Sequence, residues 1–244
     1  MKHSHSSREH WYPRFKQLLC KEWRELFIQF NAYVVIAVFL SIIAYTFTTV
    51  LFFQRDVSVV HAISQAANLL LLLIPLLTMR QFSKERDSGA LSLLLSAGCR
   101  EAEIFTAKLL VLIALNTIMI LLCFSFPLAL AVLGRPDFGV VFSGFGGLWL
   151  MAVSLIAIGL CVACFVFNPL IAALVSFAVF IGLWTVDIAS YLLPPVLQGW
   201  AERLSFDLHL SRFMSGAIYL SDLSYFLLLA AGASLLGVAR LSQR

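Results

Sequence analysis

Long stretches without a charged residue constrain this chain more than any other feature of its sequence. A helix that crosses the hydrocarbon core of a bilayer needs about 20 apolar residues. Five stretches reach that length and a shorter sixth follows; they are residues 32–53, 57–79, 109–133, 143–167, 170–193 and 223–239. Asp187 is the one Asp, Glu, Lys or Arg within them. We therefore predict an all-helical, polytopic membrane protein with six transmembrane helices.

The composition argues against the other common classes of protein. Of the 244 residues, 61% are apolar and 12% are charged, whereas soluble domains average about 25% charged residues. The net charge of +4 is small and scattered, so we do not expect the chain to bind nucleic acid. No linker or internal repeat divides the sequence. Residues 1–244 are interpreted as one membrane domain that begins with a flexible tail at residues 1–12.

The positions of the 17 Lys and Arg residues predict the orientation of the spans. Positive charge is retained on the cytoplasmic side of a membrane. Thirteen of these residues precede the first span, lie at residues 80–108 or follow the last span, and four lie in the opposite connections. Both termini are therefore predicted to be inside, in a multi-pass protein of the cell (inner) membrane.

Residues 13–28, just before the first span, have the pattern of an amphipathic helix. The apolar side chains that recur every three or four residues include Phe15, Leu19 and Trp23. The charged side chains between them include Lys21 and Glu22. Such a helix is expected to lie among the lipid headgroups of the inner leaflet. The pattern fits simple anchoring to membrane lipid and a docking surface for a partner equally well.

The cytoplasmic connection at residues 80–108 is long enough to have a function of its own. After a charged cluster, residues 90–97 form a short apolar helix that Gly98 ends. The leucines on it are Leu91, Leu94 and Leu95. Exposing these side chains to the cytosol would be costly unless something covers them. The simplest explanation is that a partner protein covers these leucines. The alternative is that the segment folds back onto the bilayer.

The external connection at residues 194–222 is the other long one. Its apolar side chains fall on one helical face, which predicts a re-entrant or interfacial pair of short helices. This segment is a candidate gate at the exit of a pathway, or a contact for an extracytoplasmic accessory protein. Simple capping of the helix bundle explains the pattern equally well.

The sequence lacks the residues that several kinds of chemistry require. No Gly-rich loop ends in Gly-Lys-Ser/Thr, so the chain cannot bind and hydrolyse ATP by that motif. His61 is the one histidine within a span, and no carboxylate on its own helix orients it, which disfavours a membrane hydrolase. Asp187 is a single intramembrane carboxylate, too few for a typical ion-coupled carrier. We expect a non-catalytic chain without a cofactor or metal of its own.

The sequence nevertheless resembles a known family over nearly its whole length. Lys21-Glu-Trp-Arg-Glu-Leu-Phe, followed by Asn31-Ala-Tyr-Val-Val, is similar to the entry helix and first span of type-2 ABC exporter permeases, in the gliding-motility and nitrous-oxide-reductase-maturation (NosY-like) branch. The string from Pro75 to Leu95 is similar to the signature of that branch, where Glu85, Gly89 and the leucines match. Its external segment is matched by residues that include Phe206, His209, Phe213, Gly216, Asp222 and Tyr225.

The resemblance implies a function that the residues alone do not name. Such permeases pair with a second permease copy or a paralogue, and a separate ABC ATPase subunit, which binds the ATP and magnesium, grips each cytoplasmic connection. Leu91, Leu94 and Leu95 would then be covered by the ATPase. The chain is therefore expected to couple ATP hydrolysis in its partner to export or to other work across the membrane. A membrane scaffold that transmits motion to an extracytoplasmic partner, and less readily an ion-coupled carrier that uses Asp187, are the alternatives.

Overall fold

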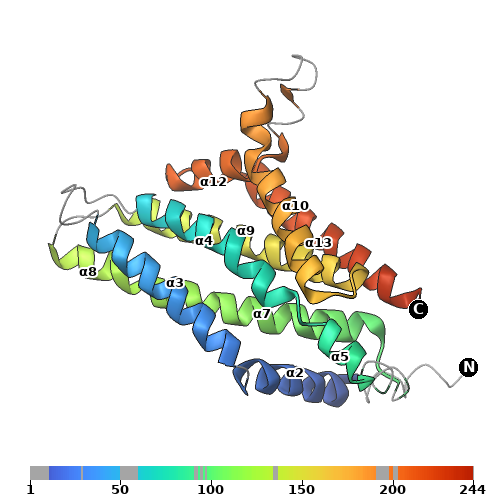
Figure 1. Cartoon of the computed structure of the whole chain (residues 1–244). Coiled ribbons are helices and arrows are strands. Elements are labelled where there is room, and N and C mark those ends of the chain that lie inside the picture. Colours follow the sequence, from blue (N-terminus) through green and yellow to red (C-terminus); the bar gives the residue numbers. More distant parts are fainter. Residues whose placement is uncertain are drawn as a thin grey trace, which may run out of the picture.

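The computed structural model describes residues 11–28, 30–49, 60–90, 93, 96, 98–133, 137–190, 198–199 and 203–243. Among these residues every element of regular structure is a helix (Figure 1). Six stretches are long and apolar enough to cross a membrane: Ala32–Thr49, Val60–Asp87, Glu101–Ala129, Phe138–Phe165, Pro169–Ile188 and Leu220–Ser242. The prediction of an all-helical, multi-pass membrane architecture is confirmed. Most of the predicted tail lies outside the described residues.

The helices follow the predicted segments, with shifts at their ends. They are α2 (Trp11–Ile28), α3 (Phe30–Thr49), α4 (Val60–Thr78), α5 (Ser83–Asp87), α7 (Glu101–Cys123), α8 (Ser125–Leu133), α9 (Phe138–Phe165), α10 (Pro169–Ser190), α12 (Phe206–Met214) and α13 (Leu220–Ser242). The main difference is that α7 begins well before residue 109. Its first turn is capped, because the Arg100 backbone N–H donates to Glu103 Oε2 at 3.2 Å.

Helix α9 lies at the centre of the bundle. It packs against α4, α7, α10, α12 and α13, and most of its residues from Gly147 to Cys164 are buried. A helix that is apolar on all sides is stable only when other elements surround it or lipid does. Among the six candidate spans α9 has the largest buried share, so it is the helix around which the others pack.

Small residues bring α9 close to α4 at two levels. A methyl group added at Gly144 would lie 2.6 Å from Ile63 Cδ1, and one added at Gly159 would lie 2.6 Å from Thr78 Oγ1. In lipid there is no hydrophobic driving force for helices to associate. Small residues let the backbones approach closely, and the van der Waals contacts that follow stabilise the helix pair instead. The pair α4–α9 therefore forms a fixed frame for the elements at both ends of the bundle.

The two ends of α9 hold different short helices (Figure 1). At its C-terminal end lie α5 and the last turns of α13, where Arg240 lies over the Phe165 ring at 5.4 Å. Near its N-terminal end lies α12, whose Phe213 meets Gly147. The rise of 1.5 Å per residue separates Gly147 from Cys164 by about 25 Å. We call these regions the α5 end and the α12 end.

Candidate functional site

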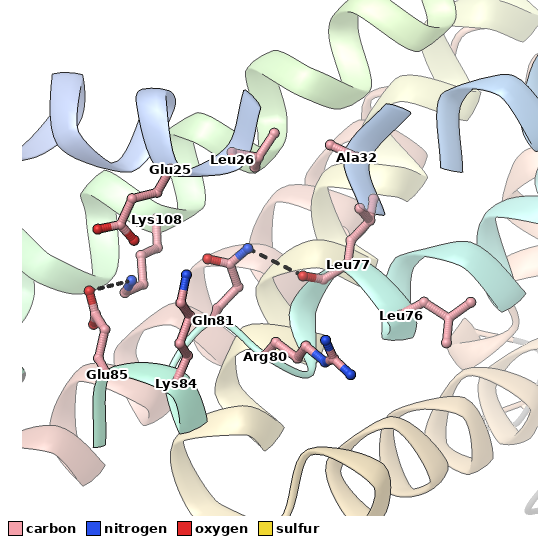
Figure 2. A pocket seen from close by; sticks show the side chains of 10 residues that line it. All are labelled: Glu25, Leu26, Ala32, Leu76, Leu77, Arg80, Gln81, Lys84, Glu85 and Lys108. Atoms are coloured by element: carbon pink, nitrogen blue, oxygen red, sulfur yellow. Dashed lines mark hydrogen bonds and ion pairs between the residues drawn. The ribbon is translucent and has the colours of Figure 1, made fainter. Parts of the chain in front are cut away.

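Four charged side chains from three helices meet at the α5 end. Lys21 and Glu22 come from α2, Glu85 from α5 and Lys108 from α7; we call them the ionic cluster. Lys21 Nζ lies 2.7 Å from Glu85 Oε1, and Lys108 Nζ lies 2.8 Å from Glu22 Oε2 and 3.1 Å from Glu85 Oε1. Figure 2 shows the contact between Lys108 and Glu85. The cluster ties α2 and α7 to the start of the connection at residues 80–108.

Burial makes the ion pairs of the ionic cluster important for the stability of the fold. Lys108 is 2% exposed, and Glu22 and Glu85 are each 4% exposed. Charges removed from water are tolerated only when they are paired with good geometry, and removing one partner leaves the other uncompensated. The Lys108 ammonium also lies 5.5 Å from the centre of the Phe82 ring. Partial burial on its own would lower the pKa of Lys21, but the hydrogen bond to Glu85 and the charges of the three nearby glutamates raise it above its ordinary value.

Arg86 fastens α5 to the central helix. Its guanidinium donates to the carbonyl oxygen of Cys164 at 2.8 Å and to that of Val166 at 3.3 Å. These carbonyls belong to the C-terminal end of α9, where backbone acceptors lack partners within the helix and cations are favoured. Helix α5 is therefore held to α2 and α7 through Glu85 and to α9 through Arg86.

The predicted coupling residues fall into two groups. Glu85 belongs to the ionic cluster, and Gly89 follows α5 with φ of +70°, a left-handed conformation that favours glycine. Leu91, Leu94 and Leu95 lie outside the described residues. Leu93, between them, is 69% exposed.

The predicted amphipathic helix corresponds to α2, and its packing differs from the simple pattern. Leu18, Glu22 and Leu26 are four residues apart and form one buried row, at 5%, 4% and 7% exposure. Phe15 and Leu19 pack partly against the core, whereas Trp23 is 36% exposed. Glu22 thus lies on the packed face rather than among the exposed charges, because Lys108 of α7 supplies a buried partner for it.

A second polar group lies at the α12 end. Asp222, at the start of α13, is 0% exposed. Its Oδ1 atom lies 2.6 Å from His209 Nδ1 and 3.1 Å from Arg212 Nη1; we call these three residues the aspartate cluster. The other imidazole nitrogen, Nε2, lies 3.1 Å from the carbonyl oxygen of Arg203. Both ring nitrogens of His209 therefore face an oxygen atom.

Aromatic packing surrounds the aspartate cluster. The Tyr225 ring stacks on His209 at 4.1 Å, and its hydroxyl donates to the Leu204 carbonyl at 2.6 Å. Phe213 is 2% exposed and lies against Gly147 of α9. Gly216 follows α12 with φ of +84° and lets the chain turn toward α13. The predicted external residues Phe213, Asp222 and Tyr225 therefore belong to one packed unit, with Gly216 at its edge.

Hydroxyl groups join this unit to the central helix. Ser143 Oγ donates to the Phe213 carbonyl at 2.8 Å, and Ser154 Oγ donates to the Phe226 carbonyl at 2.9 Å. Hydrogen bonds between helices are valuable inside a membrane because water offers no alternative partner there.

Asp187 lies half-buried on α10, near Asp207 of α12. Burial, and secondarily the charge of Asp187, raise the pKa of Asp207 above its ordinary value.

A polar groove between α3 and α4 was missed by the sequence reasoning. It has a volume of about 320 Å³ and is lined by Tyr45, Thr46, Thr49, His61, Ser64, Gln65 and Asn68. Asn68 is exposed near the middle of a predicted span, a position where a polar group facing lipid is costly. The spacing of Ser64, Gln65 and Asn68 within an apolar stretch was the available signal. We call this feature the polar groove.

Sequence reasoning also missed Lys108 and Arg86, which it counted only as positive charges in a connection. The carboxylates of Glu22, Glu25 and Glu85 approach within 4.8 Å of one another, a spacing that a metal ion could use. The ammonium groups of Lys21 and Lys108 lie within 3.5 Å of these carboxylates and offset most of their charge. In comparisons with known proteins, no family model matches the chain and no curated protein matches it.

Proposed function

We propose that this chain is the membrane-spanning permease subunit of an ABC transporter of the type-2 exporter class. In this proposal it works with a second copy of itself or a similar permease, and with a separate ATPase subunit that binds ATP and magnesium. Both termini and the connection at residues 80–108 face the cytoplasm. The sequence resemblance and the six apolar helices support the proposal.

The observation that carries the proposal is the attachment of α5. Its Glu85 contacts lysines of α2 and α7, and its Arg86 caps the end of α9. The segment that resembles the ATPase-binding connection therefore begins at an element bound to three other helices. A force that the ATPase applies to residues 88–100 would reach those helices through buried charges rather than through a free loop.

The polar groove supports a transport role. Membrane helices rarely present several hydroxyl and amide side chains outward, because lipid cannot hydrogen-bond to them. Two permeases that face each other with α3 and α4 would enclose these side chains and give a polar substrate a lined path. ATP-driven closure of the ATPase pair would push the α5 ends together and change the spacing of the two grooves.

Co-purification from the native membrane in mild detergent tests the proposal most directly. We expect two ATPase copies for two permease copies, and hydrolysis of ATP by the complex. Purification of the chain alone, without nucleotide hydrolysis, would overturn the proposal.

A point variant locates the contact. Leu94→Asp places a charge in the apolar segment that the ATPase is proposed to cover, so the ATPase should no longer co-purify. The matched control is Ile218→Asp, an equivalent change at an exposed position, 67% accessible, at the α12 end. The assignment is wrong if both variants retain a full complement of ATPase.

One observation favours a second candidate function, a scaffold that transmits motion to an extracytoplasmic partner. Ile218, Tyr219 and Leu220 are exposed by 67%, 53% and 79% beside the packed aspartate cluster. Such an apolar patch on a firmly held element suits a protein contact. ATP-dependent movement of a compound into sealed vesicles would separate the two, since the scaffold moves none.

A further inference from the structure

A cleft opens between α2 and the corner where α4 leads into α5 (Figure 2). Figure 2 shows Glu25 and Leu26 of α2 on one wall, with Arg80 and Lys84 on the opposite wall. The remaining lining residues are Ala32, Leu76, Leu77, Gln81, Glu85 and Lys108. The cleft thus combines an apolar part with a group of charged side chains.

Most of the charges in the cleft compensate one another. Glu85 is paired with Lys108 at 3.1 Å, and Glu25 lies 3.5 Å from Lys21. Arg80 and Lys84 are different: both are exposed, and within the part of the chain that the structure describes neither side chain has a hydrogen bond or ion pair. Two cations therefore remain available to an anion in the cleft.

The apolar part of the cleft continues along α4. Leu72 and Leu76 lie one helical turn apart and are 51% and 46% exposed. Arg80 follows one turn later, just beyond the end of the helix. The row runs from the interior of a candidate membrane span to its charged end. Apolar surface at bilayer depth that ends in free cations matches a ligand with a hydrocarbon chain and an anionic head.

We propose that this cleft binds an anionic phospholipid. Arg80 and Lys84 pair with its phosphate, and one acyl chain lies along Leu72 and Leu76. Basic side chains just outside a membrane span attract anionic headgroups, and the leucine row gives the lipid a second contact that an acidic peptide in water would not use. This lipid site requires only that the helices cross a membrane. Its test is therefore independent of the proposal that an ATPase binds the chain.

Native mass spectrometry of the full chain tests the site, from detergent micelles doped with equal amounts of phosphatidylglycerol and phosphatidylcholine. The wild type should retain phosphatidylglycerol in preference to phosphatidylcholine by on the order of tenfold. The double variant R80Q/K84Q should lose that preference. The control K16Q/R24Q removes two exposed cations from α2 and should keep it.

A charge-preserving variant and a competitor test for misfolding and for binding of phosphate alone. R80K/K84R preserves both charges and should retain most of the preference, which excludes misfolding as the cause of loss. Inorganic phosphate added alone should not displace the lipid. The proposal is overturned if R80Q/K84Q and K16Q/R24Q behave alike, if wild type shows no headgroup preference, or if free phosphate competes fully.

Discussion

The two ends of the bundle are held together in different ways. At the α5 end, the buried side chains of Glu22, Glu85 and Lys108 and the half-buried Lys21 meet, with an open cleft beside them. At the α12 end, one aspartate lies among aromatic rings, and serine hydroxyls tie the surrounding backbone to α9. Ion pairs hold the α5 end together. At the α12 end, close packing of aromatic side chains adds to the charged contacts of Asp222.

This difference has a consequence for motion. Ion pairs act over several ångströms and can exchange partners, while interlocked aromatic rings must separate before they move. Lys108 already contacts two carboxylates, and Lys21 lies near three. We expect the α5 end to rearrange under a force from the proposed partner, and the α12 end to move as one unit.

The strongest test of this contrast is Lys108→Met. The variant leaves Glu22 and Glu85 buried with too little positive charge, so we expect the free energy of unfolding to fall by about 3–5 kcal/mol. Unfolding of the purified protein in mixed micelles with increasing dodecyl sulfate measures the loss. Lys16→Met, at an exposed position, should change stability by less than about 0.5 kcal/mol.

The double variant Lys108→Met/Glu22→Met sharpens the same test. It removes a complete pair and leaves Lys21 with Glu85, so most of the lost stability should return. If the double variant is as unstable as the single one, packing rather than charge holds the α5 end and the contrast fails.

Asp222→Asn is the corresponding change at the α12 end. It removes the charge that His209 and Arg212 share but preserves the shape of the side chain. We expect a loss of about 2–3 kcal/mol, because charged hydrogen bonds disappear while the aromatic contacts persist. Asp87→Asn, at an exposed position on α5, is the control in the same unfolding assay. A loss larger than that of Lys108→Met would show that charge dominates both ends.

The sequence predicted the spans well because their signal is local. Each depends on about 20 consecutive residues, and no tertiary contact is needed to read it. Helix ends were less accurate: α7 begins at Glu101 because Glu103 caps it, and a charged first turn resembles a connection. The spacing of apolar residues in α2 was also visible in the sequence. Glu22 was nevertheless grouped with the exposed charges, although it lies in one buried row with Leu18 and Leu26.

The clusters could be predicted only in part. Glu85, Asp222 and Phe213 were selected through a family resemblance, which does not say what each side chain touches. Glu22 and Lys108 are 86 residues apart, and Lys21 and Glu85 are 64 apart. Such pairs depend on how three helices pack, which neither periodicity nor composition encodes.

A glycine pair tests the packing of the α12 end. A methyl group at Gly147 would lie 2.6 Å from Phe213 Cβ and Cγ, whereas one at Gly146 would meet nothing within 4 Å. Gly147→Ala should therefore cost about 1–3 kcal/mol through overpacking, and Gly146→Ala should be neutral or slightly stabilising. Equal stability of the two variants would contradict close packing of α12 on α9.

The smallest expected effect concerns pH. Burial and the charge of Asp187 raise the pKa of Asp207, so the folded state binds that proton more tightly than the unfolded state does. This contribution to stability is fully present below the unfolded pKa and is lost as the pH rises through the folded pKa. Asp207→Asn should therefore raise the melting temperature by about 1 °C at pH 7 and by nothing near pH 3, since much of the side chain is solvated. Thermal unfolding of both proteins across that range measures the difference, with Asp87→Asn as the control. A gain that is the same at every pH would mean that the carboxylate charge of Asp207 is not its source.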